Sequence, residues 1–172
     1  KEEVKYLMQI LESGLKEEIE RHKAAKKNPK MLGSGIKIRV IGQRERLPKS
    51  LQRVIEKLEY LTKNNKDFIL NLAVSYSGRW DILQAVKKII KEKTPIKKIN
   101  EVFFEKYLST ERLPAPDLVI RTSGERRISN FLLWQNAYAE LYFSDKYWPD
   151  FSKKDFQVAL KEYSKRQRRF GS

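Results

Sequence analysis

The sequence has 172 residues, enough for one domain with a hydrophobic core, and its lack of cysteine excludes disulfides and thiol chemistry. Its 37 lysines and arginines outnumber its 22 acidic residues, and the net charge of +15 favours anionic partners such as phosphates, acidic membranes or nucleic acids. A basic surface with no dedicated partner is the alternative. With neither a signal peptide nor an apolar run of ~18 residues, we expect a cytoplasmic protein, at most peripheral at a membrane.

Segments with helical and strand periodicity alternate along the chain. Apolar residues recur every three or four positions in some segments, and form short continuous or alternating runs in others. Helices are predicted at residues 1–24, 48–61, 80–91, 100–108 and 131–134 and from Ser152, and strands at 36–41, 68–74, 118–120 and 139–143.

This alternation predicts an α/β fold, with a mostly parallel central sheet flanked by helices. No internal repeat or low-complexity block interrupts it. A single domain over residues 1–172 is therefore expected, with a lysine-rich loop at residues 24–35.

The strand at 118–120 is short and fully apolar, which is typical of a strand buried on both faces of a parallel sheet. In open α/β sheets, ligands bind beyond the carboxyl ends of the strands. Arg121 follows this strand directly and is succeeded by the flexible Thr122-Ser123-Gly124. Arg121 is therefore predicted to lie at a ligand site.

Two further groups after Arg121 suit the binding of phosphate. The planar guanidinium of Arg127 matches phosphate oxygens, and Ser129 suits the N-cap of the next predicted helix, whose free N–H groups attract anions. Arg121, Arg127 and Ser129 together predict a diphosphate site. The alternative is that these arginines are solvated or pair with Glu125 and Asp117.

Two other charged residues are candidates for the same chemistry. Glu140 alternates with apolar neighbours on a predicted strand, close to the basic loop. Alone it would be an ion-pair partner, but beside a diphosphate it could help to hold Mg²⁺. Arg79, at the end of another strand, could contact phosphate or pair with Asp81, and both alternatives stay open.

Three segments carry a family resemblance: Arg121-Thr-Ser-Gly-Glu-Arg-Arg-Ile-Ser-Asn-Phe-Leu-Leu-Trp-Gln135, Ala137-Tyr-Ala-Glu-Leu-Tyr-Phe143 and Trp148-Pro-Asp-Phe151. In this order they closely resemble the cis-prenyltransferases, of which the undecaprenyl diphosphate synthases are the nearest kind. The similarity runs from Ile36 to Gly171. It implies a homodimeric enzyme that uses Mg²⁺ to add isopentenyl units, with cis stereochemistry, to farnesyl diphosphate and so makes a lipid carrier for cell-wall synthesis.

The resemblance also assigns roles to particular residues. Arg121, Arg127 and Ser129 match the positions that hold the diphosphate of isopentenyl diphosphate, and Glu140 matches a carboxylate linked to the Mg²⁺ site. Arg169 and Gly171 match an Arg-x-Gly tail that reaches across the dimer interface toward the substrate diphosphates. Arg79 is a further expected diphosphate contact.

Some family motifs do not occur in this chain. The Asp-Gly-Asn-Gly-Arg-Trp-Ala motif, which supplies the catalytic, Mg²⁺-binding aspartate, is absent, and so is Phe-Ser-Thr-Glu-Asn-Trp. We therefore expect the chain to begin part-way into the family pattern and to contain no catalytic residue. A piece of a complete enzyme, active only as part of that protein, is favoured over the alternative of a truncated, inactive form. Ser75-Tyr-Ser-Gly-Arg79 replaces the usual Asn-Tyr-Gly-Gly-Arg, which weakens the role of Arg79.

Two other functions are alternatives. A non-catalytic partner subunit of a two-subunit prenyltransferase would share the fold, but such subunits lose active-site residues, and here Arg121, Arg127, Ser129 and Glu140 are kept. A nucleic-acid-binding domain would explain the net charge and the basic stretch at 165–169. Because no recognised binding motif supports it, nucleic acid is not expected as a partner.

Overall fold

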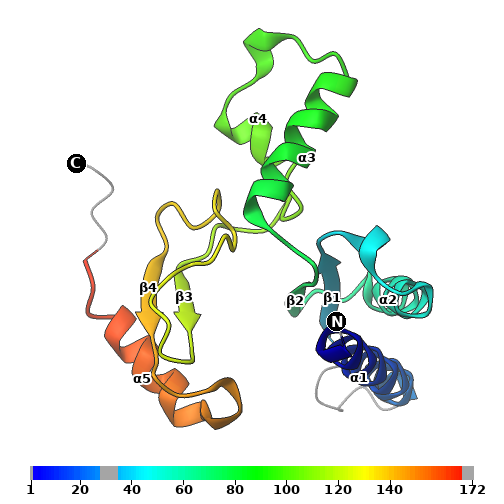
Figure 1. The fold of residues 1–172 in the computed structure, drawn as a ribbon, viewed down its shortest axis with the longest axis vertical. Helices are drawn as coiled ribbons and strands as arrows, with labels where there is room; N and C mark the ends of the chain where they lie inside the picture. Colours follow the sequence, from blue (N-terminus) through cyan, green and yellow to red (C-terminus); the bar gives the residue numbers. More distant parts are fainter. Residues whose placement is uncertain (1, 28–34, 168–172) are drawn as a thin grey trace. The chain divides into compact units, whose positions relative to one another are not determined.

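The computed structural model describes residues 2–27 and 35–167 (Figure 1). The chain divides into two compact units, Lys1–Tyr76 and Ser77–Ser172, and each is described by itself. Both units contain parallel strands and helices, so the predicted α/β class is confirmed. The expectation of a single domain stays a prediction.

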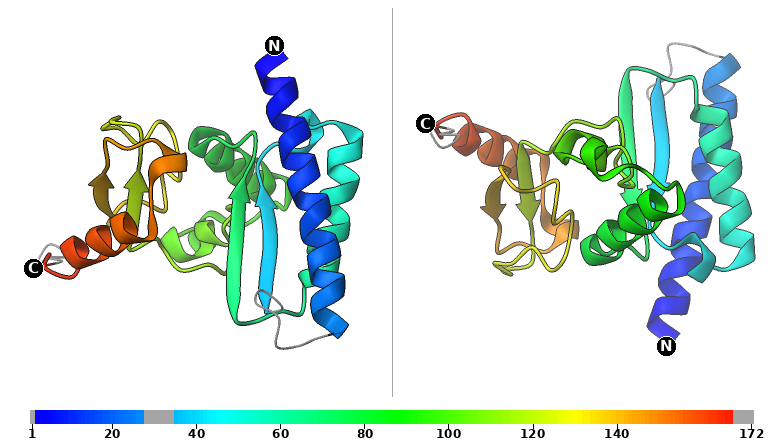
Figure 2. Two further views of the ribbon diagram at one scale, coloured as in Figure 1. Left: turned by 90° about the horizontal axis from the view of Figure 1, so that it is seen from below. Right: turned by 90° about the horizontal axis from the view of Figure 1, so that it is seen from above.

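The first unit has two helices beside one parallel strand pair. Strand β1 (Ile36–Ile41) pairs with β2 (Phe68–Ala73) in a register that joins Ile36 to Phe68. Helices α1 (Glu2–Lys27) and α2 (Lys49–Thr62) lie together on one side of this pair (Figure 2). The core between them consists of Leu15, Ile19, Ile38, Val40, Leu47, Leu51, Ile55 and Leu58.

Only part of the apolar stripe predicted on α1 is buried. Leu15 and Ile19 belong to the core, whereas Val4 and Leu7 are 58% and 53% exposed. Met8 and Leu11 pack against this core as well, so the core-facing role that periodicity predicts holds for α1 beyond its first two turns.

Side chains of α2 close the outer edge of β1. The amide of Ile38 donates to Thr62 Oγ1 at 3.1 Å, and the amide of Val40 donates to Glu59 Oε1 at 2.8 Å. Arg44 also pairs with Glu59 and donates to the carbonyl of Val40 at 2.7 Å. These amides would otherwise lie unpaired at a strand edge, so α2 both covers β1 and satisfies its backbone.

We expect Thr62→Val to destabilise the first unit by about 1–3 kcal/mol, because the buried Ile38 amide would lose its acceptor while the side-chain shape is retained. Urea unfolding of the complete protein measures this. Thr62→Ser is the control, since it keeps the hydroxyl. Equal stability of wild type and the valine variant would show that this hydrogen bond contributes nothing.

The second unit contains three α-helices and a second parallel strand pair in its described part. Strand β3 (Leu118–Arg121) pairs with β4 (Glu140–Phe143), with Leu118 opposite Glu140 and Arg121 opposite Phe143 (Figure 1). The remaining elements are α3 (Gly78–Lys91), α4 (Glu101–Glu105) and α5 (Lys153–Tyr163), with short 3-10 turns at Ile96–Lys98 and Trp148–Asp150.

Helix α5 begins where the sequence predicts, at a capping box. The Ser152 hydroxyl accepts from the Asp155 amide, and the Asp155 carboxylate accepts from the Ser152 amide at 2.8 Å. Lys146 Nζ lies 2.8 Å from Asp155 Oδ1. Hydrogen bonds from Lys146 and Ser152 hold the pKa of Asp155 well below its ordinary value, so this carboxylate stays charged and ties α5 to the segment after β4.

The helix predicted at residues 131–134 is wrong: the structure has turns there. Ser129, Asn130 and Leu132 have φ angles of 44°, 62° and 47°, in the left-handed region, which a right-handed helix excludes. Asn130 accounts for this conformation, because its backbone carbonyl and side chain are both bound to the start of α3.

Candidate functional site

The predicted basic residues after β3 come together in the structure. Arg121, the last residue of β3, donates from Nη1 to Ser129 Oγ at 2.8 Å and to the carbonyl of Arg127. Arg127 donates from Nε to the same Ser129 oxygen at 3.1 Å. Two guanidinium groups thus converge on one hydroxyl, and we call Arg121, Arg127 and Ser129 the arginine–serine cluster.

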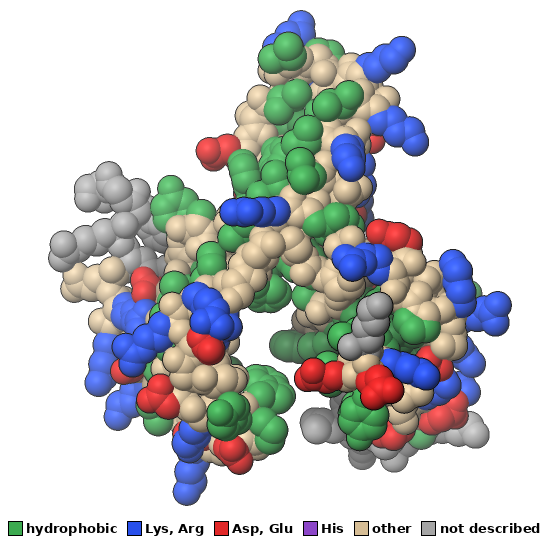
Figure 3. Space-filling view, in the orientation of Figure 1, with side chains coloured by type: hydrophobic (Ala, Val, Ile, Leu, Met, Phe, Trp, Pro, Cys, Tyr) green, Lys and Arg blue, Asp and Glu red, His purple; other side chains and the backbone are tan. Residues whose placement is uncertain are grey.

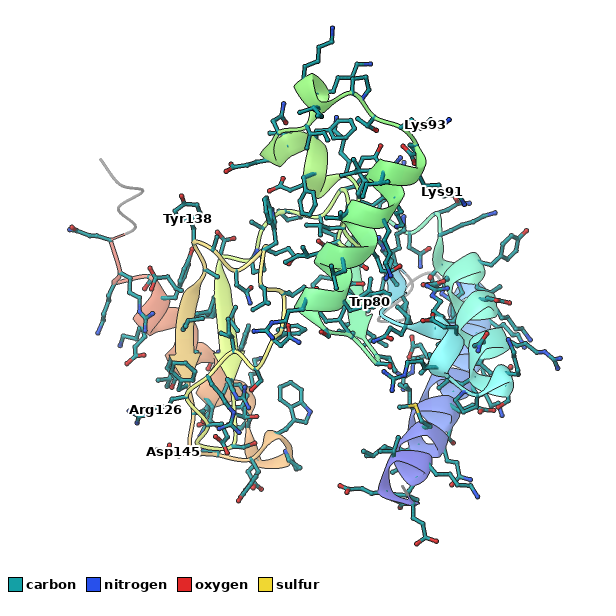
Figure 4. All side chains as sticks on the ribbon, turned by 45° about the horizontal axis from the view of Figure 1, so that its top comes forward. Trp80, Lys91, Lys93, Arg126, Tyr138 and Asp145 are labelled. Carbon is teal, nitrogen blue, oxygen red and sulfur yellow. The ribbon has the colours of Figure 1, made fainter. Side chains whose placement is uncertain are left out.

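Backbone hydrogen bonds between neighbouring segments hold the loop in place. The Ser123 amide donates to the carbonyl of Lys146 at 2.7 Å, and the Gly124 amide donates to the carbonyl of Ser144 at 2.9 Å. Gly124 has a φ of 71°, a conformation that suits glycine. The segment after β4 therefore supports the loop, and the labelled Arg126 and Asp145 lie at this same end of the strands (Figure 4).

The electrostatics of the cluster suit an anion. The carboxylate of Glu125 forms an ion pair with Arg127, so the predicted alternative pairing does occur for one of the two arginines. Both side chains of this pair are exposed, where ion pairs are worth little. A diphosphate could replace Glu125 and accept hydrogen bonds from both guanidinium groups and the hydroxyl.

Basic side chains are not confined to this cluster. Lysines and arginines are spread over the visible surface of both units, among fewer acidic side chains (Figure 3). The net charge therefore raises the potential around the whole chain, and the convergence of side chains, rather than charge alone, distinguishes the arginine–serine cluster.

The helix N-terminus that was expected beside the cluster is replaced by a turn that caps α3. The amides of Gly78 and Arg79 donate to the carbonyl and side-chain oxygens of Asn130, at 2.7 and 3.0 Å. Asn130 Nδ2 donates to Ser77 Oγ, the N-cap of α3, at 2.6 Å. Asn130 was not among the predicted site residues, because its partners lie more than fifty residues away in the chain.

Arg79 is brought next to the cluster by its backbone. Its amide is bound to Asn130, the residue after Ser129, and its side chain is exposed. The carboxylate of Asp81, the alternative partner of Arg79, accepts from the amide and hydroxyl of Ser109 at 2.8 and 2.6 Å. The position of Arg79 agrees with a phosphate contact, and its role stays a prediction.

Glu140 lies away from the basic loop, contrary to the sequence-based expectation. It pairs with Leu118, three positions before Arg121, which places it about 10 Å from Arg121 along the strands. Its carboxylate forms an ion pair with Arg166 at 2.7 Å, and Arg166 also donates to the carbonyl of Leu141 at 3.0 Å. The parallel register, which the sequence pattern does not reveal, explains the difference.

The described residues do not fit a magnesium site on their own. Within residues 2–27 and 35–167, no three histidine, cysteine or acidic side chains lie close enough together to hold a metal ion. Glu140 is a single carboxylate with an arginine partner. Arg169 and Gly171, the predicted tail contacts, lie outside the described residues.

An open cleft of about 960 Å³ lies elsewhere in the second unit. It is lined by α4, by residues 110–117 and by part of the segment 133–138, including Trp134 and Tyr138. The arginine–serine cluster is not among the described residues that line it. The cleft and the cluster are therefore two separate features.

The structure therefore defines an α/β protein with an arginine–serine cluster at the carboxyl end of β3, which is where open α/β sheets bind ligands. Residues 1–171 match the prenyltransferase family model described as undecaprenyl diphosphate synthase, and the chain belongs to this family. The predicted resemblance and the predicted type of activity, prenyl transfer, are thereby confirmed.

Named relatives agree with this assignment. A ditrans,polycis-undecaprenyl-diphosphate synthase of Legionella pneumophila strain Philadelphia 1, farnesyl-diphosphate specific, is 45% identical over 98% of this chain and 69% of its own length. A tritrans,polycis synthase of Thermoplasma acidophilum, geranylgeranyl-diphosphate specific, is 45% identical over 99% of this chain and 65% of its own length.

A solved structure is similar as well. Lavandulyl diphosphate synthase from Lavandula x intermedia, in complex with dimethylallyl diphosphate, has a TM-score of 0.89 and 38% identity, over 100% of this chain and 72% of its own. At 38% identity the similarity indicates a shared family as well as a shared fold.

None of the helices in the described parts of the chain has the length and apolar character of a membrane span.

Proposed function

We propose that the complete protein transfers isopentenyl units from isopentenyl diphosphate to farnesyl diphosphate with cis stereochemistry, and so makes a long polyprenyl diphosphate. One observation carries the proposal: the guanidinium groups of Arg121 and Arg127 converge on Ser129 Oγ, at 2.8 and 3.1 Å. These three groups bind the diphosphate of isopentenyl diphosphate.

The chemistry makes this binding useful. A new carbon–carbon bond forms as the allylic carbon–oxygen bond breaks, and diphosphate leaves with the bonding electrons. The isopentenyl unit then loses a proton, which the released diphosphate accepts. Arg121 and Arg127 keep the isopentenyl diphosphate in place and orient its double bond, which lowers the entropic part of the barrier. Glu125 gives way to the incoming diphosphate, because its exposed ion pair with Arg127 is weak.

The choice of allylic substrate is part of the proposal. The relatives named above include a farnesyl-specific synthase and a geranylgeranyl-specific synthase, and the structural relative is bound to dimethylallyl diphosphate. We propose farnesyl diphosphate, and a product used as a lipid carrier. Side-by-side assays with the three allylic diphosphates decide between them.

The remaining expectations concern the complete protein. We propose that it requires Mg²⁺, works as a cytoplasmic homodimer, and touches membranes only peripherally. Diphosphates are commonly bound through Mg²⁺ with one or two carboxylates, which is the support for the metal. Arg169 and Gly171 are proposed to approach the substrate diphosphates across the dimer interface.

The test uses the complete protein with labelled isopentenyl diphosphate, each allylic diphosphate in turn, and Mg²⁺ with or without a chelator. We expect farnesyl diphosphate to give a ladder of long cis-polyprenols after dephosphorylation, and the chelator to abolish it. A folded protein that makes no product, but becomes active when a second protein is added, would support the partner-subunit alternative instead.

A further inference from the structure

The end of α3 and the turn after it form an exposed surface of lysines and isoleucines. Between residues 87 and 98 the chain carries six lysines and one acidic residue, Glu92. All six lysines are exposed, and the labelled Lys91 and Lys93 project from the end of α3 (Figure 4). We call these six lysines, together with the exposed apolar residues from Ile90 to Val102, the lysine–isoleucine surface.

Large apolar residues of this segment are exposed among the lysines. Ile96 is 87% exposed, Ile90 and Val102 are each 69% exposed, and Ile99 is 41% exposed. Figure 3 shows hydrophobic and basic side chains next to one another over α3 and α4. A solvated helix face explains exposed lysines, but four exposed large apolar residues among them indicate a partner that is both anionic and apolar.

Hydrogen bonds give the segment a definite shape. The Lys93 amide donates to the carbonyl of Ile90 at 3.0 Å, and the Ile99 amide donates to the carbonyl of Ile96 at 2.9 Å. Glu92 accepts from the hydroxyl of Tyr107 at 2.6 Å, so its carboxylate is held toward Tyr107. The lysines and isoleucines are thus presented from a folded turn.

We propose that the lysine–isoleucine surface docks the protein on the anionic face of a lipid membrane. The lysines are attracted to acidic headgroups, while the isoleucines insert at the boundary between headgroups and acyl chains. This surface gives a location to the peripheral membrane contact of the proposed function. Its purpose rests on that function, because a long polyprenyl diphosphate leaves the protein most easily at a membrane. Vesicle binding itself needs no turnover.

The test is sedimentation of the complete protein with phosphatidylcholine vesicles, with or without phosphatidylglycerol. Binding is expected only with phosphatidylglycerol. Lys97→Gln/Lys98→Gln should weaken it about twenty-five-fold, from a factor of roughly five per lysine. Ile90→Gln/Ile96→Gln should weaken it about ten-fold or more, through the loss of apolar burial. Circular dichroism checks the folding of each variant.

Matched controls lie on α5. Lys153→Gln/Lys154→Gln removes the same charge, and Val158→Gln removes a similar exposed apolar group. Both should change vesicle binding by about two-fold or less, because the attraction is local. If these controls weaken binding as much as the variants at α3, general charge rather than this surface attracts the protein, and the proposal is wrong.

An RNA arm separates the other class of anionic partner. Two results together would contradict the membrane proposal: RNA displaces the protein from vesicles, and Ile90→Gln/Ile96→Gln binds vesicles as strongly as the wild type does. The surface would then bind nucleic acid. Prenyl transfer to soluble substrates is measured on the same variants. Loss of vesicle binding with normal transfer supports the docking role, whereas a protein inactive in every form that still binds vesicles contradicts only the proposed function.

Discussion

Arg121→Ala is expected to lower kcat/KM for isopentenyl diphosphate by about 10²–10⁴-fold in the complete protein. Arg121 supplies one guanidinium to the proposed diphosphate site and also holds Ser129 and the carbonyl of Arg127. Two charge-assisted hydrogen bonds of about 1.5–3 kcal/mol each, combined with a tenfold change per 1.4 kcal/mol, give this range. Initial rates over a series of isopentenyl diphosphate concentrations measure it.

Two variants show whether geometry or charge causes the loss. Arg121→Lys keeps the charge but removes the planar fork, so we expect an intermediate rate. Arg126→Ala removes a charge from the same loop outside the arginine–serine cluster, and about a three-fold effect or less is expected for such an exposed charge. Equal losses for Arg121→Ala and Arg126→Ala would mean that the loop acts only through its net charge, and full activity of Arg121→Ala would remove this site from the mechanism.

Asp81→Ala is expected to destabilise the second unit by about 3–4 kcal/mol. The side chain is buried, with 2% exposure, and its carboxylate accepts from the Ser109 amide, the Ser109 hydroxyl and Gln135 Nε2. The two Ser109 donors would lose this charged acceptor, at about 1.5–2 kcal/mol each, whereas Gln135 Nε2 keeps Thr110 Oγ1 as an acceptor. Denaturant unfolding followed by tryptophan fluorescence measures the loss.

The control for this experiment is an aspartate at the surface. Asp150→Ala removes an exposed carboxylate of the same unit and should change stability by about 0.5 kcal/mol or less. Asp81→Asn keeps one acceptor oxygen and should lie between the two. If Asp81→Ala unfolds at the same denaturant concentration as wild type, the Asp81 network does not stabilise the unit.

The predicted elements succeeded where the pattern is local. Strands at 36–41 and 68–74 and the helix after Ser152 were predicted from apolar runs and periodicity, and β1, β2 and α5 confirm them. Arg121 was placed at a strand end because an apolar run stops there, and its cluster with Arg127 and Ser129 needs only a short loop. These features depend on residues within about ten positions of one another.

Predictions failed where distant segments meet. The stretch after Ser129 has helix-forming residues, yet Asn130 binds the start of α3, and these long-range hydrogen bonds impose left-handed backbone angles that no local propensity indicates. Glu140 was expected near Arg121, but the parallel register pairs it with Leu118.

The sequence by itself therefore determined the order of helices and strands, the family and the arginine–serine cluster, because periodicity, capping and motif spacing act over short distances. Only the tertiary structure decided three features: the strand register, in which Glu140 lies opposite Leu118 and pairs with Arg166; the turn at Asn130; and the burial of Asp81. Each of these depends on hydrogen bonds and packing between residues far apart in the chain, which a linear pattern does not encode.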